Sequence, residues 1–314
     1  MTTAQGSDQP KGPLVPGGPI AGMQFWRLSW RILRARARLM IPAALVLGAI
    51  SAGAQMWLII RAAGSVRAAV DADMNLAAIL TPLMKGGSHS GQLLLFGVLG
   101  GFLVTSLIIP SVANSGLVAV VNDAINDSNR AGRAYIRSGV RALPSVIGAQ
   151  VIQTVVALGP VVVVYVEVIA QGRVNTKLGS AIDLFIGLPL AVLALYLTIG
   201  WYFTPQTVVI EGVKPIAAMK ASAALTRRSR LRVISILLAT LLVTGFISLA
   251  VATPISWIAT LNGGSAAGPT LGSQLVSEFI TQWAQQAVTI IASASVLTLL
   301  YTDLKRRSEG AQYL

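Results

Sequence analysis

A stripe of polar side chains runs along the last apolar segment of the chain. At steps of three or four residues it consists of Glu278, Gln282, Gln285, Thr289 and Ser293, which places all five on one face of an α-helix. Inside a membrane, such a face must be turned toward protein or water rather than lipid. The stripe would either form hydrogen bonds between packed helices or line a polar cavity. We predict that Glu278, Gln282 and Gln285 point into a helical bundle, and that Thr289 belongs to the same interior site.

Two further carboxylates are candidates for this interior site. Glu167 and Asp183 flank a short loop that holds Arg173 and Lys177, with which they would otherwise pair at the membrane surface. Most other chemistry lacks the residues it needs, because the chain has no Cys and only one His, His89. Thiol catalysis, disulfides and iron–sulfur clusters are therefore excluded. The sequence predicts no metal site, no cofactor and no enzymatic activity.

The elements that position these residues are predicted to be membrane helices. Of the 314 residues, 54% are hydrophobic and 11% are charged, whereas a soluble domain carries about 25% charged residues. A helix needs about 20 apolar residues to cross a bilayer. Six segments qualify: 39–60, 92–121, 144–169, 182–203, 233–261 and 274–302. We predict an all-α polytopic membrane bundle of six transmembrane helices, formed as one domain by residues 23–314.

The basic residues are divided unevenly between the two sides of this bundle. Of the 24 Lys and Arg residues, 19 fall on one side and five on the other. Because basic residues collect on the cytoplasmic side, both termini are predicted to be cytoplasmic, in the inner membrane of a bacterium. The formal charge of +13 then favours anionic lipid as a partner rather than nucleic acid. Residues 1–22, rich in Gly and Pro, are predicted to be a disordered cytoplasmic tail.

A basic amphipathic segment, residues 23–38, precedes the first span. Apolar residues, among them Trp26 and Trp30, cover most of its surface, and a basic stripe consists of Arg27, Arg31, Arg34 and Arg38. A helix of this kind suits the headgroup layer of a membrane. It would either anchor the first span or recognise a specific lipid.

Basic segments also precede the third and fifth spans. The former contains Arg133, Arg137 and Arg141 at steps of four residues; the latter contains Lys220, Arg227, Arg228, Arg230 and Arg232. A basic amphipathic helix followed by two spans thus occurs three times, which predicts a three-fold repeat of hairpins about an axis along the membrane normal. We expect Arg227 and Arg228, together with the amphipathic segment, to contact lipid or a membrane-protein partner.

Two segments carry a resemblance to a known family. Residues 205–232 contain the pair Glu211-Gly212 and then a helix with Ala218, Ser222, Leu225 and Arg227, and residues 301–310 read YTDLKRRSEG. Both resemble bacterial proteins described as the membrane domain of glycerophosphoryl diester phosphodiesterase. The family's Arg before the Ser and Trp after it are Ala221 and Ala223 here. The resemblance implies a six-span bundle, and the residues of the phosphodiesterase barrel are absent from this sequence.

The acids in these two segments lie among basic residues. Asp303 and Glu309 adjoin Lys305, Arg306 and Arg307, and Glu211 belongs to a strongly basic loop. We expect structural ion pairs that close the cytoplasmic side, in which Glu211 and Asp303 pair with Arg227, Arg228 or Arg307.

Two functions fit these features. The first is a non-enzymatic accessory or scaffold protein of the membrane that binds lipid or a membrane-protein partner. The second is a small transporter or amphiphile-binding protein, with a polar cavity lined by the last span. A continuous cavity between spans would favour the second function.

Overall fold

The computed structural model describes Ile20 and residues 22–65, 68–69, 97, 100–101, 105, 109–126, 128, 132–171, 188–262 and 271–310. Over these residues the chain is helical, without strands. The main helices are α1 (Gly22–Ala63), α5 (Ile109–Ile125), α6 (Gly132–Gln171), α8 (Leu188–Gly200), α9 (Thr204–Glu211), α10 (Pro215–Arg227), α11 (Arg230–Asn262) and α12 (Leu271–Gly310).

Five helical stretches in the described ranges are long and apolar enough to cross a membrane. They lie in α1, in α6, in α8 with α9, in α11 and in α12, and so overlap the predicted first, third, fourth, fifth and sixth spans. Of the predicted second span, 92–121, the first part is described at only a few residues, and its last part lies in α5. The described part of the chain is thus all-helical, with several helices of membrane-crossing length.

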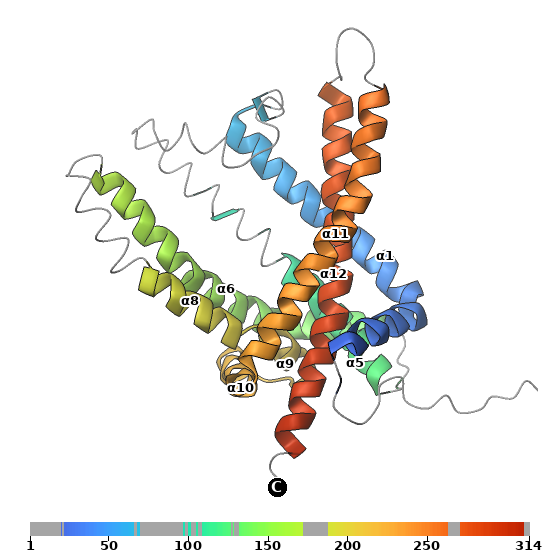
Figure 1. Ribbon diagram of the computed structural model, residues 1–314, viewed down its shortest axis with the longest axis vertical. Coiled ribbons are helices and arrows are strands. Elements are labelled where there is room, and N and C mark those ends of the chain that lie inside the picture. The colour runs from blue at the N-terminus through green and yellow to red at the C-terminus, as the bar shows by residue number, and fades with distance from the viewer. Residues whose placement is uncertain are drawn as a thin grey trace, which may run out of the picture.

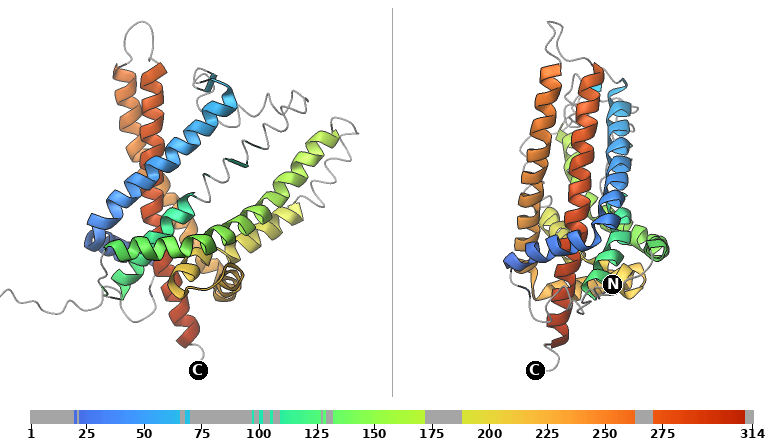
Figure 2. Two further views of the ribbon diagram at one scale, coloured as in Figure 1. Left: turned by 180° about the vertical axis from the view of Figure 1, so that it is seen from behind. Right: turned by 90° about the vertical axis from the view of Figure 1, so that its right-hand side faces the viewer.

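The helices converge at one end of the molecule and diverge at the other (Figures 1 and 2). The converging end holds the first part of α1, the start of α6, α9, α10, the start of α11 and the last turns of α12; we call it the basic end. From it, α11 and α12 rise as a long antiparallel pair, while α6 and α8 lean away from them together. The first residues of α1 and the last residues of α12 both lie toward the basic end.

Helix α12 is the central element of the bundle. It packs against α1, α5 and α11, and 67% of its apolar stretch is buried, compared with 11% of the stretch in α11. Its close contact with α1 depends on Gly48, since a Cβ atom there would lie 3.0 Å from the Ala287 nitrogen and 3.1 Å from the Trp283 carbonyl oxygen. A small residue at a helix crossing allows backbones to approach in this way.

The amphipathic segment forms the first part of α1 and turns across the bundle at Arg36, whose φ of −118° and ψ of 18° are not helical. Its Phe25, Leu28 and Ile32 are buried in the same core cluster as residues of α12. The segment is therefore helical, as predicted, but its apolar face packs on protein instead of lying only in the headgroup layer. The pattern of polar residues predicts which face of such a helix is exposed, whereas the packing of the other helices determines what covers its apolar face.

The three basic segments join their spans in three different ways. The first is separated from its span by the kink at Arg36. The second is continuous with the span, because α6 runs from Gly132 to Gln171 without interruption. The third is divided between the separate helix α10, which holds Lys220 and Arg227, and the start of α11, which holds Arg230 and Arg232, with a turn between them. The three-fold repeat of hairpins is not evident from these junctions and stays a prediction.

Candidate functional site

A buried carboxylate, Asp303, ties together three parts of the basic end. Its side chain is 1% exposed. One oxygen, Oδ1, accepts a hydrogen bond from the Ile20 backbone N–H at 2.8 Å. The other, Oδ2, lies 3.0 Å from Nη2 of Arg232 and accepts a hydrogen bond from Nε of Arg307 at 2.9 Å. We call Asp303, Arg232, Arg307 and Ile20 the Asp303 cluster.

The Asp303 cluster holds the segment that leads into α1. Arg232 donates a second hydrogen bond to the Ile20 carbonyl oxygen, so the backbone of Ile20 is bound on both sides. Ile20 itself is only 1% exposed. Ile20 lies within residues 1–22, whose disorder stays a prediction, and composition could not reveal the buried charge pair that binds its backbone.

A second acid, Glu211 at the end of α9, is bound by α12. Its Oε1 accepts hydrogen bonds from the Tyr301 hydroxyl at 2.6 Å and from Nζ of Lys305 at 2.7 Å. The following residue, Gly212, ends the helix in the left-handed conformation, with φ of 68°, which a glycine adopts without strain. The two segments that carry the family resemblance thus contact each other directly.

Helix α10 is fixed to the end of α8 by hydroxyl groups. The Gly200 carbonyl, which has no partner in its own helix, accepts hydrogen bonds from Ser222 at 2.8 Å and from Thr226 at 3.3 Å. Ser222 also accepts a hydrogen bond from the Phe203 backbone N–H at 3.1 Å. These bonds satisfy polar groups that a helix end leaves open, and they give Ser222 of the motif a structural role.

Only some of the predicted ion pairs form. The pair between Asp303 and Arg307 is confirmed. The prediction that Glu211 pairs with Arg227 or Arg228 is wrong, since Glu211 binds Lys305 of α12 instead. Glu309 is exposed and forms no ion pair within the described residues. The sequence could not reveal Arg232 as a partner of Asp303, because the two residues meet only through the packing of α11 on α12.

The predicted lipid-contact arginines lie at the surface of the basic end. Exposed residues are Arg27, Arg31, Arg34, Arg38, Arg227 and Arg228. Trp30 is 54% exposed, and the Arg34 guanidinium lies 5.1 Å from the centre of its ring. Trp26 is only partly exposed. It lines an apolar pocket of about 270 Å³ between the amphipathic segment and the α11–α12 pair.

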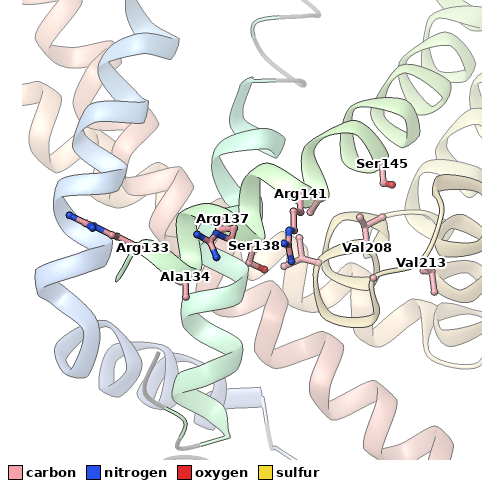
Figure 3. A pocket seen from close by; sticks show the side chains of 11 residues that line it. Arg133, Ala134, Arg137, Ser138, Arg141, Ser145, Val208 and Val213 are labelled. Atoms are coloured by element: carbon pink, nitrogen blue, oxygen red, sulfur yellow. The ribbon is translucent and has the colours of Figure 1, made fainter. Parts of the chain in front are cut away.

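A groove of about 540 Å³ runs between the start of α6 and the end of α9 (Figure 3). Along the α6 wall, Arg137 and Arg141 lie near each other with Ser138 between them, Arg133 points away from them at one end, and Ser145 lies farther along the helix. The opposite wall is apolar and consists of Val208, Val209, Gly212 and Val213. We call this feature the arginine groove. Sequence spacing placed the three arginines on one face, but α9 as the second wall comes from the fold.

The polar stripe of α12 does not face the bundle as a whole. Glu278 and Gln282 are partly exposed and share a hydrogen bond of 3.1 Å along their own helix. Gln285 and Thr289 are exposed, so the predicted inward orientation is wrong for Gln285. Ser293 is the stripe residue that contacts another helix in the described structure: it accepts a hydrogen bond of 3.0 Å from Asn114 of α5.

The glutamine of α12 that bonds to another helix is Gln286, one position from the predicted residue. Its amide donates a hydrogen bond of 3.3 Å to Gln55 of α1. Gln153 of α6 does not take part in this contact. Its amide donates a hydrogen bond of 2.9 Å to the Trp201 carbonyl oxygen. A step of one residue turns a helix by about 100°, and the position of α1 decides which amide faces inward.

A second groove, of about 380 Å³, lies among α8, α11 and α12. Its lining is largely apolar and includes Tyr202, Leu238, Thr244, Thr289 and Ser293. The last two residues of the polar stripe, Thr289 and Ser293, therefore line a groove, whereas Glu278 and Gln282 do not.

The two other acids of the predicted interior site lack described side chains. Glu167 lies in α6, in a part whose side chains are outside the description, and Asp183 lies outside the described residues altogether. Among the described residues, no group of three His, Cys, Asp or Glu side chains is arranged to hold a metal ion.

Comparison with known proteins gives no further assignment. No family profile, curated protein or solved structure matches the chain. The resemblance in residues 205–232 and 301–310 stays a prediction. Function must therefore be argued from the basic end itself.

Proposed function

We propose that the chain is a non-enzymatic membrane protein of accessory or scaffold type, which binds anionic lipid or a membrane-protein partner through its basic end. The proposal rests mainly on how the amphipathic segment is packed. Its apolar residues Phe25 and Ile32 are fully buried, so the helix is held in place by protein packing. Its arginine stripe and Trp30 are left exposed.

This arrangement fits an anionic membrane surface. Arginine side chains bind phosphate groups through several hydrogen bonds, and each basic residue near such a surface contributes about 1 kcal/mol of attraction. An exposed Trp suits the boundary between headgroups and acyl chains. Because the helix is already folded and docked, little conformational entropy is lost when lipid or a partner binds.

The proposal includes six spans with both termini in the cytoplasm, in the inner membrane of a bacterium. The unequal division of the basic residues supports this orientation. So does the position of the basic segments, which lie at the same end of the molecule as the last turns of α12. The resemblance to the phosphodiesterase-associated membrane domain implies the same six-span bundle, and the three-fold repeat of hairpins belongs to this proposal as well.

A second candidate function is the binding of an amphiphile by the groove among α8, α11 and α12. Its volume of about 380 Å³ lies within the range of roughly 300–1,000 Å³ found for small-molecule pockets. Leu238→Trp would fill the groove from an exposed position without removing any of the hydrogen bonds described above. If this variant binds a fluorescent fatty acid as strongly as the original protein does, the second function is excluded.

The first function is tested by extracting the protein with its surrounding lipid into polymer discs and measuring the lipid composition by mass spectrometry. We expect a higher fraction of anionic lipid in the discs than in the membrane from which they were taken. Replacement of all four stripe arginines (Arg27, Arg31, Arg34 and Arg38) by Gln should bring this fraction down toward that of the membrane.

A charge-conserving variant is the matched control. The same four positions changed to Lys keep both the charge and the topology signal, so the enrichment of anionic lipid should persist. If the original protein shows no enrichment over the bulk membrane, the proposed role of the basic end in lipid binding is wrong.

A further inference from the structure

The arginine groove differs from the Asp303 cluster because no acid of the described residues pairs with its arginines. No hydrogen bond or ion pair joins Arg133, Arg137 or Arg141 to another residue in the described part of the chain. The acid next to the groove, Glu211, is bound by Tyr301 and Lys305 of α12. Three positive charges therefore line a groove of about 540 Å³, and the described residues provide no counter-charge for them.

The position of these arginines in their helix is unfavourable without an anion. Residues four apart are neighbours on a helix, so Arg137 lies between two like charges, each of which destabilises the helix. Arg133 also lies in the first turn of α6, near the positive end of the helix dipole, and this turn contains no acidic residue. A bound anion would remove both penalties at once.

We propose that the arginine groove binds the phosphate headgroup of an anionic lipid that carries at least two negative charges. The guanidinium groups of Arg137 and Arg141 with the hydroxyl of Ser138 between them form a donor set suited to phosphate oxygens, and Arg133 adds a further positive charge at one end of the groove. The inference deepens the proposed function, on which it rests, by assigning one saturable lipid site to one groove. Basic pockets of this kind on the cytoplasmic side of membrane helices accept multiply charged headgroups.

The surroundings of the groove favour a lipid over a soluble phosphate. The wall opposite the arginines is apolar. Farther along α6, inside the predicted third span, Ile147, Val151 and Val155 are exposed by 38%, 44% and 63%. Acyl chains can therefore lie along α6 while the headgroup stays at the level of Arg137 and Arg141.

The experiment is native mass spectrometry of the full chain, released from detergent after titration with single lipids. The probes are cardiolipin and phosphatidic acid, with phosphatidylglycerol, phosphatidylcholine and inorganic phosphate as comparisons. We expect one saturable adduct with cardiolipin or phosphatidic acid, weaker binding of phosphatidylglycerol, and no adduct with phosphatidylcholine. Saturation by inorganic phosphate at the same concentrations would show a site for soluble anions and would overturn the lipid assignment.

Two variants locate the adduct. Arg137→Gln combined with Arg141→Gln should weaken it by about thirtyfold, because two basic residues are lost from the site. Arg27→Gln combined with Arg31→Gln removes the same charge, at the same spacing, from the exposed stripe and should leave the saturable adduct in place. Equal weakening by both pairs would show a diffuse charge effect and would contradict the proposal.

The outcomes also separate this inference from the proposed function. Loss of the saturable adduct with continued enrichment of anionic lipid in polymer discs would reject the groove and keep the proposed function. A saturable adduct that persists without enrichment of anionic lipid in polymer discs would keep the groove and reject the proposed function.

Discussion

Two sets of arginines at the basic end differ in what neutralises their charge. In the Asp303 cluster, Arg232 and Arg307 lie against a carboxylate that is 1% exposed. In the arginine groove, Arg133, Arg137 and Arg141 have no acidic partner in the described chain. The same residue type therefore serves two purposes: paired arginines close the bundle, and unpaired ones leave positive charge available to a ligand.

The largest effect is expected from removing the buried charge of the Asp303 cluster. Asp303→Asn keeps the shape of the side chain but leaves two arginines without a counter-charge, which should cost about 3 kcal/mol of stability. The thermal midpoint, followed through the fluorescence of the six Trp residues, should fall by roughly 6–12 °C. Glu309→Gln, at an exposed acid of the same helix, is the control, and an equal loss in both variants would break the comparison.

The second paired acid should matter less, because it is more exposed. Glu211→Ala removes the hydrogen bonds from Tyr301 and Lys305, whose side chains connect α9 to α12. With Glu211 28% and Lys305 38% exposed, solvent screens the pair, and we expect a loss of about 1.5 kcal/mol. A thermal midpoint equal to that of the original protein would show that Glu211 does not support the basic end.

Close packing of α1 on α12 stabilises the bundle farther along α12, independently of the charges at the basic end. In Gly48→Ala, the new Cβ would meet backbone atoms of Trp283 and Ala287, so the helices must separate. The cost of this overpacking exceeds the gain in helix propensity by about 1 kcal/mol. Gly245→Ala on α11, where nothing lies within 4 Å of the added atom, should leave the midpoint unchanged or raise it slightly. Destabilisation by both substitutions to the same extent would count against the packing argument.

The smallest expected effect is an increase in stability rather than a loss. Arg137→Gln relieves two like-charge contacts along α6, so lipid-free protein should become more stable by about 0.5 kcal/mol. The gain should shrink as salt is added, because salt screens exposed charges. A loss of stability in detergent without lipid would mean that Arg137 has a partner within the protein, and the contrast between the two arginine sets would fail.

Much of the fold could be predicted from the sequence, and the reasons for the failures are physical. Apolar length located the membrane helices, and helical spacing placed Arg133, Arg137 and Arg141 on one face. These are properties of single segments. What could not be predicted depends on contacts between distant segments, such as the 94-residue separation of Glu211 from Lys305.

The candidate site shows the same division. Polarity alone indicated Gln285 as an inward residue, yet Gln286 faces Gln55 because α1 crosses α12 there. Ile20 belongs to a segment whose composition indicates disorder, yet Arg232 and Asp303 bind its backbone. In both cases the deciding partner lies in another helix, and no local pattern identifies it.

The most direct test of the account measures two properties of two variants side by side: the thermal midpoint in lipid-free detergent and the number of cardiolipin molecules bound. Asp303→Asn should lower the midpoint and still bind one cardiolipin at temperatures where it is folded. Arg137→Gln with Arg141→Gln should keep or raise the midpoint and lose the bound lipid. If stability and lipid binding fall together in both variants, the two sets of arginines do not have separate roles and the account is wrong.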